Sequence, residues 1–285
     1  MINWEHFLTI ITFSVLLLFF SFLAGLVGAL TGLGGGVVVI PVLVLLFHIN
    51  IHFAMGASLI SVMATSSGTA AAYLREGYTN LRIGIFLETA AVIGALIGAL
   101  MTAMLSKTLL AILFSLVLFF SAYLTVKRKE EHEEYPTSHP WAIKLNLNGT
   151  YPLGKKLTAY YVQHVPYAMV IMGLAGVFSG LLGIGSGALK VLAMDQALRL
   201  PYKVATTTSN FMIGITAAVS AGIYFSHGYI NPTLTFPVMI GVIAGSFCGA
   251  KILTRMHHRT LRLIFSIVIC LIGLQMLYKA ITGTL

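Results

Sequence analysis

The feature that most constrains this chain is the recurrence of apolar runs long enough to cross a bilayer. Water is absent from the bilayer core, so a spanning segment must satisfy its own backbone hydrogen bonds. A helix of about 18 apolar residues or more does so. The composition agrees, since 58% of the 285 residues are hydrophobic and only 9% are charged, too few to cover a soluble surface. We therefore predict an all-α polytopic membrane protein. The long runs fall at 7–30, 53–74, 83–105, 108–126, 167–182, 204–226, 233–253 and 261–281.

Two further apolar runs, at 37–47 and 187–198, are too short to cross a bilayer alone. Helices of this length rise about 17 Å, roughly half of the hydrocarbon thickness. Each run follows a glycine cluster, LGGGVVV in the first case and IGSGALK in the second. We interpret 7–47 as a re-entrant hairpin broken at its glycines, and 167–199 as a second hairpin of the same kind.

The two halves of the chain repeat each other at an offset of 151 residues. Chance similarity between apolar segments would match Leu with Val at any offset, but it would not align glycine, Asn and Tyr at one offset. The sequence thus predicts a first repeat at 1–126, a polar insert at 127–165 and a second repeat at 166–285. Each repeat is expected to be a broken hairpin followed by three transmembrane helices. The matched positions include Gly25 and Gly176, Gly32 and Gly183, Gly34 and Gly185, Gly36 and Gly187, Ser58 and Ser209, Thr65 and Thr216, Tyr73 and Tyr224, and Gly94 and Gly245.

The Lys and Arg residues of the loops orient the chain. Placing the loops at 75–82 and 254–262 and the insert at 127–165 in the cytoplasm keeps most loop cations inside, as the positive-inside rule requires. This distribution also accounts for the net charge of +9 without invoking nucleic acid. The twin loops 77–80 and 228–231 then lie on opposite sides, which predicts inverted topology, typical of secondary transporters. Both termini are predicted outside the cell membrane.

We predict that the two glycine bends form a shared anion site near the midplane. A helix N-terminus carries four backbone N–H groups without intrahelical partners and a partial positive charge, and glycine lets a ligand approach it closely. A nucleotide-binding loop is a poor alternative, because no Gly-Lys-Ser/Thr follows either bend. Close helix packing is the other alternative, and we favour it for the patterns Gly94/Gly98, Gly176/Gly180 and Gly245/Gly249. The bend residues expected to contact substrate are Gly34, Gly35, Gly36, Gly185, Ser186 and Gly187.

Polar side chains at membrane depth are further candidates. Hydroxyl and amide groups can ligate an oxyanion without the desolvation cost of a full charge. Alternatively, they bond back to their own helix or to a neighbouring one, and the sequence leaves both interpretations open. Thr65 and Thr216 are weaker candidates of the same kind. The stronger ones are Ser58, Thr206, Thr207, Ser209 and Asn210.

Two ionisable residues lie inside predicted membrane segments. Lys190 is about 13 Å by helical rise from the cytoplasmic end of its short run, so we expect its ammonium to face a cavity and attract an anion. The first half has Val39 at the matched position. Glu88 could relay protons, but we favour an interfacial pair with Arg75 or Arg82.

The segments that carry these motifs resemble the sulfite exporter TauE/SafE family. GLVGALTGLGGGVVVIPVLVLLF followed by AMGASL resembles its first half, and GVFSGLLGIGSGALKVLAM followed by LPYKVATTTSNF resembles its second half. The resemblance covers 24–105 and 172–280. It implies a permease for sulfite, sulfonates and related small anions, with the glycine bends, Pro41 and the Ser58/Ser209 region as the positions carried over.

The sequence therefore predicts a secondary transporter of a small anion, with an anion channel or a carboxylate permease as alternatives. We expect no enzyme, because the acids form no catalytic cluster. Cys248 and Cys270 lie in apolar runs and predict no disulfide or metal site, and no cofactor is expected. The expected partners are the small anion, the lipid bilayer and coupling protons.

Overall fold

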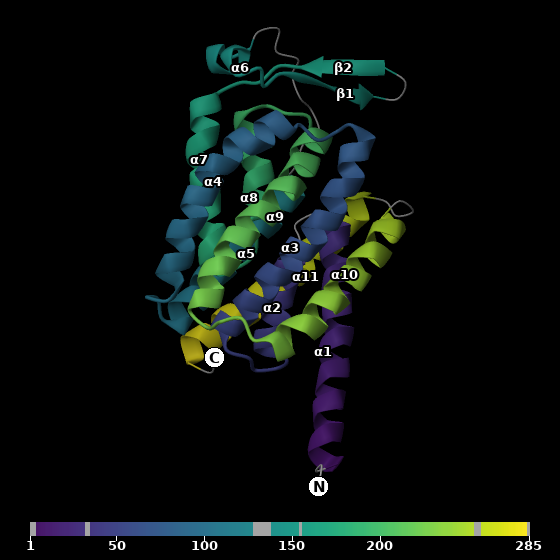
Figure 1. The fold of residues 1–285 in the computed structure, drawn as a ribbon, viewed down its shortest axis with the longest axis vertical. Helices are drawn as coiled ribbons and strands as arrows, with labels where there is room; N and C mark the ends of the chain where they lie inside the picture. Colours follow the sequence, from purple (N-terminus) through teal and green to yellow (C-terminus); the bar gives the residue numbers. More distant parts are fainter. Residues whose placement is uncertain (1–3, 32–34, 128–137, 154–155, 254–257, 284–285) are drawn as a thin grey trace.

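Each long apolar run forms a helix in the computed structural model, which describes residues 4–31, 35–127, 138–153, 156–253 and 258–283 (Figure 1). Among these residues, five helices are long and apolar enough to cross a membrane, which confirms the prediction of an all-α polytopic membrane protein. The elements are α1 (Trp4–Thr31), α2 (Gly36–Leu45), α3 (Ile51–Glu76), α4 (Leu81–Thr102), α5 (Lys107–Lys127), α6 (Pro140–Lys144), β1 (Gly149–Leu153), β2 (Lys156–Tyr160), α7 (Val165–Leu182), α8 (Gly187–Leu192), the π-helical turn η1 (Ala193–Ala197), α9 (Tyr202–Ser226), α10 (Pro232–Leu253) and α11 (His258–Thr282).

Both short runs turn back beside the helix that precedes them. In the first half, the ring of Phe47 lies 5.6 Å from that of Phe13 and 5.8 Å from that of Phe20, both on α1. In the second half, the backbone N–H of Gln163, just before α7, donates to the carbonyl of Leu198 at 3.1 Å. The predicted broken hairpins are therefore present.

The second short run differs from the prediction in one respect. We expected one helix over 187–198, but α8 ends at Leu192 and the chain continues as η1. The N–H of Leu198 bonds to the carbonyl of Ala193, five residues back, at 3.3 Å. A π-helical turn is wider than an α-helical one, so this run is shorter and broader than a regular helix.

The helix crossings of the two halves correspond at the same offset of 151 residues. A Cβ added at Gly94 on α4 would lie 2.9 Å from the backbone nitrogen of Val177 on α7, and one at Gly245 on α10 would lie 2.9 Å from that of Leu26 on α1. Glycine is required at both crossings, because real Cβ atoms do not come this close. The packing interpretation of these small-residue patterns is confirmed for both helices.

The central helices α3 and α9 run antiparallel. Early in α3, Gly56 packs against the carbonyl of Tyr229, just beyond the end of α9. After the end of α3, the backbone N–H of Asn80 donates to Thr208 Oγ1, early in α9, at 3.1 Å. These two matched helices, one from each half, thus point in opposite directions.

The twin loops are built alike and lie at opposite ends of the bundle (Figure 1). Each opens with a glycine in the left-handed region, Gly77 with φ 74° and Gly228 with φ 73°, the usual way to end a helix. Each closes with an Asn whose Oδ1 accepts a backbone N–H at the start of the next helix, from Ile83 at 3.1 Å and from Thr233 at 3.0 Å. Inverted repeats would have this arrangement, and both their presence and their orientation in a bilayer stay predictions.

The polar insert contains a β-hairpin that the sequence analysis did not anticipate. β1 and β2 pair antiparallel, with Gly149 opposite Tyr160. Asn80 anchors the hairpin to the start of α4, because its side-chain amide donates to the carbonyl of Leu147 at 3.1 Å and to the hydroxyl of Tyr160 at 2.7 Å. The insert caps one end of the bundle, and both termini lie toward the opposite end (Figure 1).

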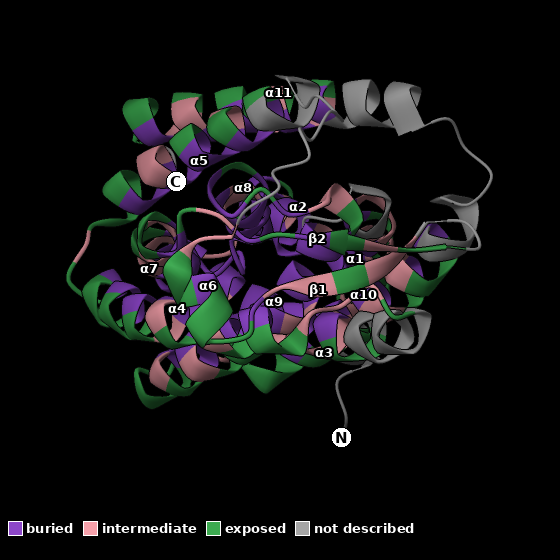
Figure 2. Ribbon diagram, turned by 90° about the horizontal axis from the view of Figure 1, so that it is seen from above, coloured by how far each residue is buried: buried purple, intermediate pink, exposed green. Residues whose placement is uncertain are grey.

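The exterior of the bundle is apolar. Figure 2 shows buried residues on the facing sides of the helices and exposed residues on their outer sides. Large apolar side chains such as Ile85, Ile93 and Leu100 on α4, and Phe236 and Phe247 on α10, are exposed there. An exterior of this kind suits contact with lipid rather than with water.

Candidate functional site

The two glycine bends meet at the centre of the molecule. A Cβ at Gly36 would lie 2.5 Å from Ser58 Oγ and 3.4 Å from the Cα of Ile184, which belongs to the other bend. Ser58 Oγ donates to the carbonyl of Gly183 at 2.8 Å, and Ser209 Oγ donates to that of Gly187 at 3.3 Å. We call Gly36, Ser58, Gly183–Gly187 and Ser209 the central cluster. It unites residues from both halves, as the sequence predicted.

The backbone of the second bend explains its residue choice. Gly183, Gly185 and Ser186 have φ of 65°, 70° and 42°, in the left-handed region that glycine adopts without strain. Ser186 tolerates this conformation with its Oγ donating to the carbonyl of Ala175 at 2.6 Å. Gly34 of the first bend lies outside the described residues.

Two aliphatic side chains, those of Val62 and Ile213, pack against the glycine bends. A Cβ at Gly36 would lie 2.9 Å from Val62 Cγ2, and one at Gly185 would lie 3.0 Å from Val62 Cγ1 and 2.7 Å from Ile213 Cγ2. Val62 on α3 and Ile213 on α9 occupy matched positions of the repeat and are both buried. Val62 therefore packs against both bends, and Ile213 packs against the second bend.

The polar residues at the start of α9 were candidates either for contact with a substrate or for bonds within the helix bundle, and they differ in this respect. Thr207 Oγ1 bonds back to the carbonyls of Lys203 and Val204, at 2.9 and 3.2 Å, so it belongs to its own helix. Ser209 reaches the second bend, as described above. The buried Thr206 Oγ1 has no hydrogen-bond partner in the described part of the chain, and Asn210 is buried.

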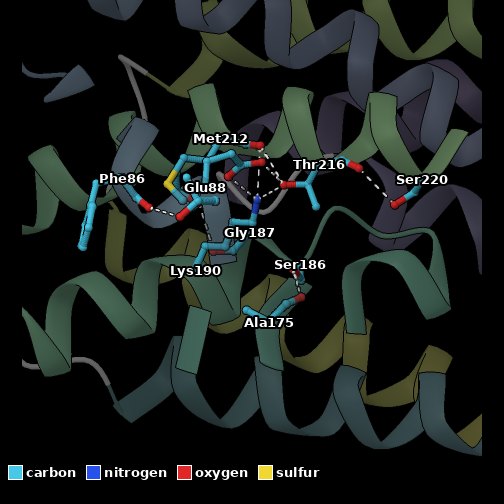
Figure 3. A network of polar contacts seen from close by, with 11 residues as sticks. Phe86, Glu88, Ala175, Ser186, Gly187, Lys190, Met212, Thr216 and Ser220 are labelled. Atoms are coloured by element: carbon cyan, nitrogen blue, oxygen red, sulfur yellow. Dashed lines mark hydrogen bonds and ion pairs between the residues drawn. The ribbon is translucent and has the colours of Figure 1, made fainter. Parts of the chain in front are cut away.

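Lys190 and Glu88 form a buried ion pair (Figure 3). The Lys190 side chain is 0% exposed, and its Nζ lies 3.2 Å from Glu88 Oε2. The ammonium also donates to the carbonyl of Met212 at 3.2 Å and to Thr216 Oγ1. Thr216 Oγ1 in turn contacts the other carboxylate oxygen of Glu88. This network joins α4, α8 and α9 one helical turn beyond the contact between Gly187 and Ser209.

The pairing predicted for Glu88 was wrong, because its partner is Lys190 rather than Arg75 or Arg82. Arg82 instead reaches the carbonyl of Asn146 in the insert. The error came from considering neighbours close in the sequence, whereas the true partner is 102 residues away. A signal was available: two opposite charges at membrane depth are each costly alone and become tolerable when paired.

The charged residues of this network have no charged counterparts at the matched positions of the repeat. Glu88 of the first half matches Met239 of the second, whereas Lys190 and Thr216 of the second half match Val39 and Thr65 of the first. Thr65 Oγ1 bonds back to the carbonyls of Ser61 and Val62, at 3.0 and 3.1 Å. The ion pair therefore joins the two halves at one of two related sets of positions, and the other set carries apolar residues in place of both charges.

A bundle of apolar helices with two re-entrant hairpins and a buried ion pair beside their meeting point defines a polytopic membrane protein of the transporter class. Comparison with known proteins gives the particular family. The family profile described as Sulfite exporter TauE/SafE matches residues 17–276, and the chain belongs to this family.

Related proteins span nearly the same length. "Probable membrane transporter protein YdhB" of Bacillus subtilis is 31% identical, with 93% of this chain and 100% of that protein aligned. "Probable membrane transporter protein YunE" of the same organism is 28% identical over 94% and 98% of the two chains. "Probable membrane transporter protein MJ0441" of Methanocaldococcus jannaschii is 24% identical over 92% and 94%. No solved structure matches the chain significantly.

Proposed function

We propose that this chain is a secondary transporter that carries a small anion, of the sulfite, sulfonate or related sulfur-oxyanion class, across the cell membrane. The observation that carries the proposal is the fully buried Lys190 ammonium, one helical turn from the glycine bend in the central cluster. A cation at this depth is costly and is typical of a substrate or ion pathway. The family description, which names a sulfite exporter, supports the choice of anion.

The substrate would bind between the two bends, where Ser58, Ser209 and the backbone N–H groups of the bends offer hydrogen bonds to an oxyanion. Lys190 would supply the positive charge, and Thr206 and Asn210 would supply further polar contacts. Rocking of one half against the other would expose this site alternately to each side of the membrane. The antiparallel α3 and α9 and the twin loops at opposite ends support this inverted arrangement, with the insert cytoplasmic and both termini outside.

Transport is tested by counterflow in liposomes that contain the purified protein. Labelled sulfite, thiosulfate, methanesulfonate and acetate would be offered to liposomes preloaded with the same unlabelled anion. We expect saturable, trans-stimulated uptake of a sulfur oxyanion, and its loss in Lys190→Met. Uptake without saturation or trans-stimulation would indicate an anion channel, and preference for acetate would indicate a carboxylate permease.

Alternating access is tested by thiol labelling. Cys248 and Cys270 would first be replaced by Ala, and single cysteines would then be placed at the matched positions Val38 and Leu189. We expect each to react with a polar thiol reagent from one side, in a manner that substrate changes. Positions that stay unreactive from both sides, with and without substrate, would contradict the proposed pathway.

A further inference from the structure

Every donor of the Lys190 ammonium already has an acceptor. An ammonium has three N–H donors, and here they meet Glu88 Oε2, the carbonyl of Met212 and Thr216 Oγ1. An incoming anion therefore has to displace one of these acceptors. Met212 O is part of the α9 backbone, and Thr216 Oγ1 is held by a bond to that same carbonyl at 2.9 Å. Glu88 is the acceptor that competes with an anion in charge as well as in position.

The ion pair is not needed to build this crossing of helices. The positions related by the repeat hold Val39 in the first half and Met239 in the second, and the glycine contacts of the two halves match. Replacing a buried ion pair by apolar residues is often neutral or stabilising in proteins. A pair kept at only one of the two related sets of positions at such a desolvation cost, beside the central cluster, points to a functional role.

Two anions cannot share one buried ammonium without strong repulsion, since charges interact strongly in a low dielectric. When the substrate anion occupies Lys190, the Glu88 carboxylate would be left buried without its counter-charge, an unfavourable state that protonation relieves. We propose that Glu88 is the proton-carrying residue of this transporter. It acts as an internal counter-anion that the substrate displaces from Lys190, and it takes up one proton from water as it leaves. This inference rests on the proposed function.

Among the described residues, no other charged side chain forms a hydrogen bond or an ion pair with the side chain of Glu88 or Lys190. In the part of the chain that the structure describes, the side chains of Glu88 and Lys190 bond to each other, to Thr216 and to the carbonyl of Met212. The described elements packed against α4 and α8 carry other titratable groups, none of which bonds to Glu88 or Lys190. These are Tyr167 on α7, exposed; Lys203, Tyr202 and Tyr224 on α9, with Lys203 over the Tyr78 ring and Tyr224 bonded to Thr102; Asp195 on η1, bonded to Gln196; Lys107 and Tyr123 on α5; and Arg82 on α4 itself, bonded to Asn146.

Displacement of Glu88 from Lys190 by the substrate, with protonation of Glu88, predicts a fixed stoichiometry of one proton for each anion. Binding of a monoanion then adds no net charge, whereas binding of a dianion adds one negative charge. Methanesulfonate and thiosulfate are suitable probes, because they keep one and two negative charges across the working pH range. Methanesulfonate flux should be insensitive to an imposed membrane potential and thiosulfate flux sensitive to it. The reverse pattern would overturn the inference.

The decisive variant is Glu88→Gln, which resembles the protonated acid in shape and charge. We expect it to keep methanesulfonate counterflow but to lose uptake driven by a pH gradient. In the wild type the apparent affinity should fall by about tenfold per pH unit once Glu88 is ionised, and in the variant this slope should vanish. Lys190→Met should lose both counterflow and gradient-driven uptake. Gradient-driven uptake that persists in Glu88→Gln would overturn the inference while leaving the proposed function intact.

Absence of wild-type counterflow for every probe would instead reject the proposed function. If Glu88→Gln does not fold, the wild type still decides the matter. Methanesulfonate added to the purified protein in weak buffer should cause uptake of about one proton per bound anion, as a pH dye reports. Binding without proton uptake would refute the role of Glu88.

Discussion

The contribution of the buried ion pair to stability can be measured with the residues that the chain itself carries at the matched positions of the repeat. Glu88→Met and Lys190→Val give Glu88 and Lys190 the side chains found at Met239 and Val39. Each single change leaves the partner charge buried with only neutral contacts. Losing one member of a buried pair typically destabilises by about 3–5 kcal/mol. The double variant should instead lie within about 1 kcal/mol of the wild type or exceed it, because no charge is left without a partner.

Thermal unfolding of the purified protein in detergent provides the assay. At about 2–4 °C for each kcal/mol, either single variant should melt on the order of 10 °C below the wild type, and the double variant close to it. Thr89→Ala, a change on the exposed side of α4 next to Glu88, is the matched control and should alter stability by less than about 0.5 kcal/mol. A double variant that melts as low as the sum of the two single losses would refute this account of the pair.

The remaining predictions concern the backbone devices of the fold. Gly94→Ala and Gly245→Ala should each destabilise by about 1–3 kcal/mol and by similar amounts in the same melting assay, since their Cβ atoms would lie 2.9 Å from a backbone nitrogen of the crossing helix; unequal losses would contradict the structural repeat. Gly222→Ala, whose Cβ would meet nothing within 4 Å, should raise stability by up to about 1 kcal/mol. Gly185→Ala should destabilise by about 1–2 kcal/mol, because its φ of 70° is left-handed. Asn80→Ala should remove about 1–3 kcal/mol and speed proteolytic cleavage of the insert, which its amide anchors; an unchanged digestion rate would exclude that anchoring role.

The architecture was predictable because its causes are local in the sequence. Hydropathy marks each spanning helix, and a run too short to cross a bilayer has to turn back, as the contact between Phe47 and Phe13 shows it does. The repeat added information that single segments lack. Since Gly94 and Gly245 match at the offset that also matches the twin loops, the sequence indicated related crossings before any coordinates were considered.

The site was predictable only in part, because its geometry depends on which helices become neighbours. The sequence indicated that Ser58 and Ser209 would approach the bends, but it gave no way to see that Thr207 would bond to its own helix. The pairing of Glu88 with Lys190 is a contact between α4 and α8, and nothing in either segment alone specifies it. The hairpin of the insert was missed for a similar reason, since Asn80, far from it in sequence, holds it in place.

The two halves share their backbone geometry but differ in several side chains. The shared geometry and the differing side chains have separate physical causes. Close crossings leave room only for glycine, so the geometry constrains both halves equally. Side chains at the ends are less constrained. Lys203 lies 5.4 Å over the Tyr78 ring at one end, and the His52 ring lies 4.8 Å from the Tyr229 ring, tilted by 33°, at the other, at matched positions. The cation falls on the end predicted to be cytoplasmic, as membrane orientation favours. In the interior, a second buried ion pair would add a large desolvation cost, and a small anion at the meeting point of the bends needs only one ammonium. We therefore interpret Val39 and Met239 as the apolar half of a site in which Lys190 and Glu88 concentrate the charge.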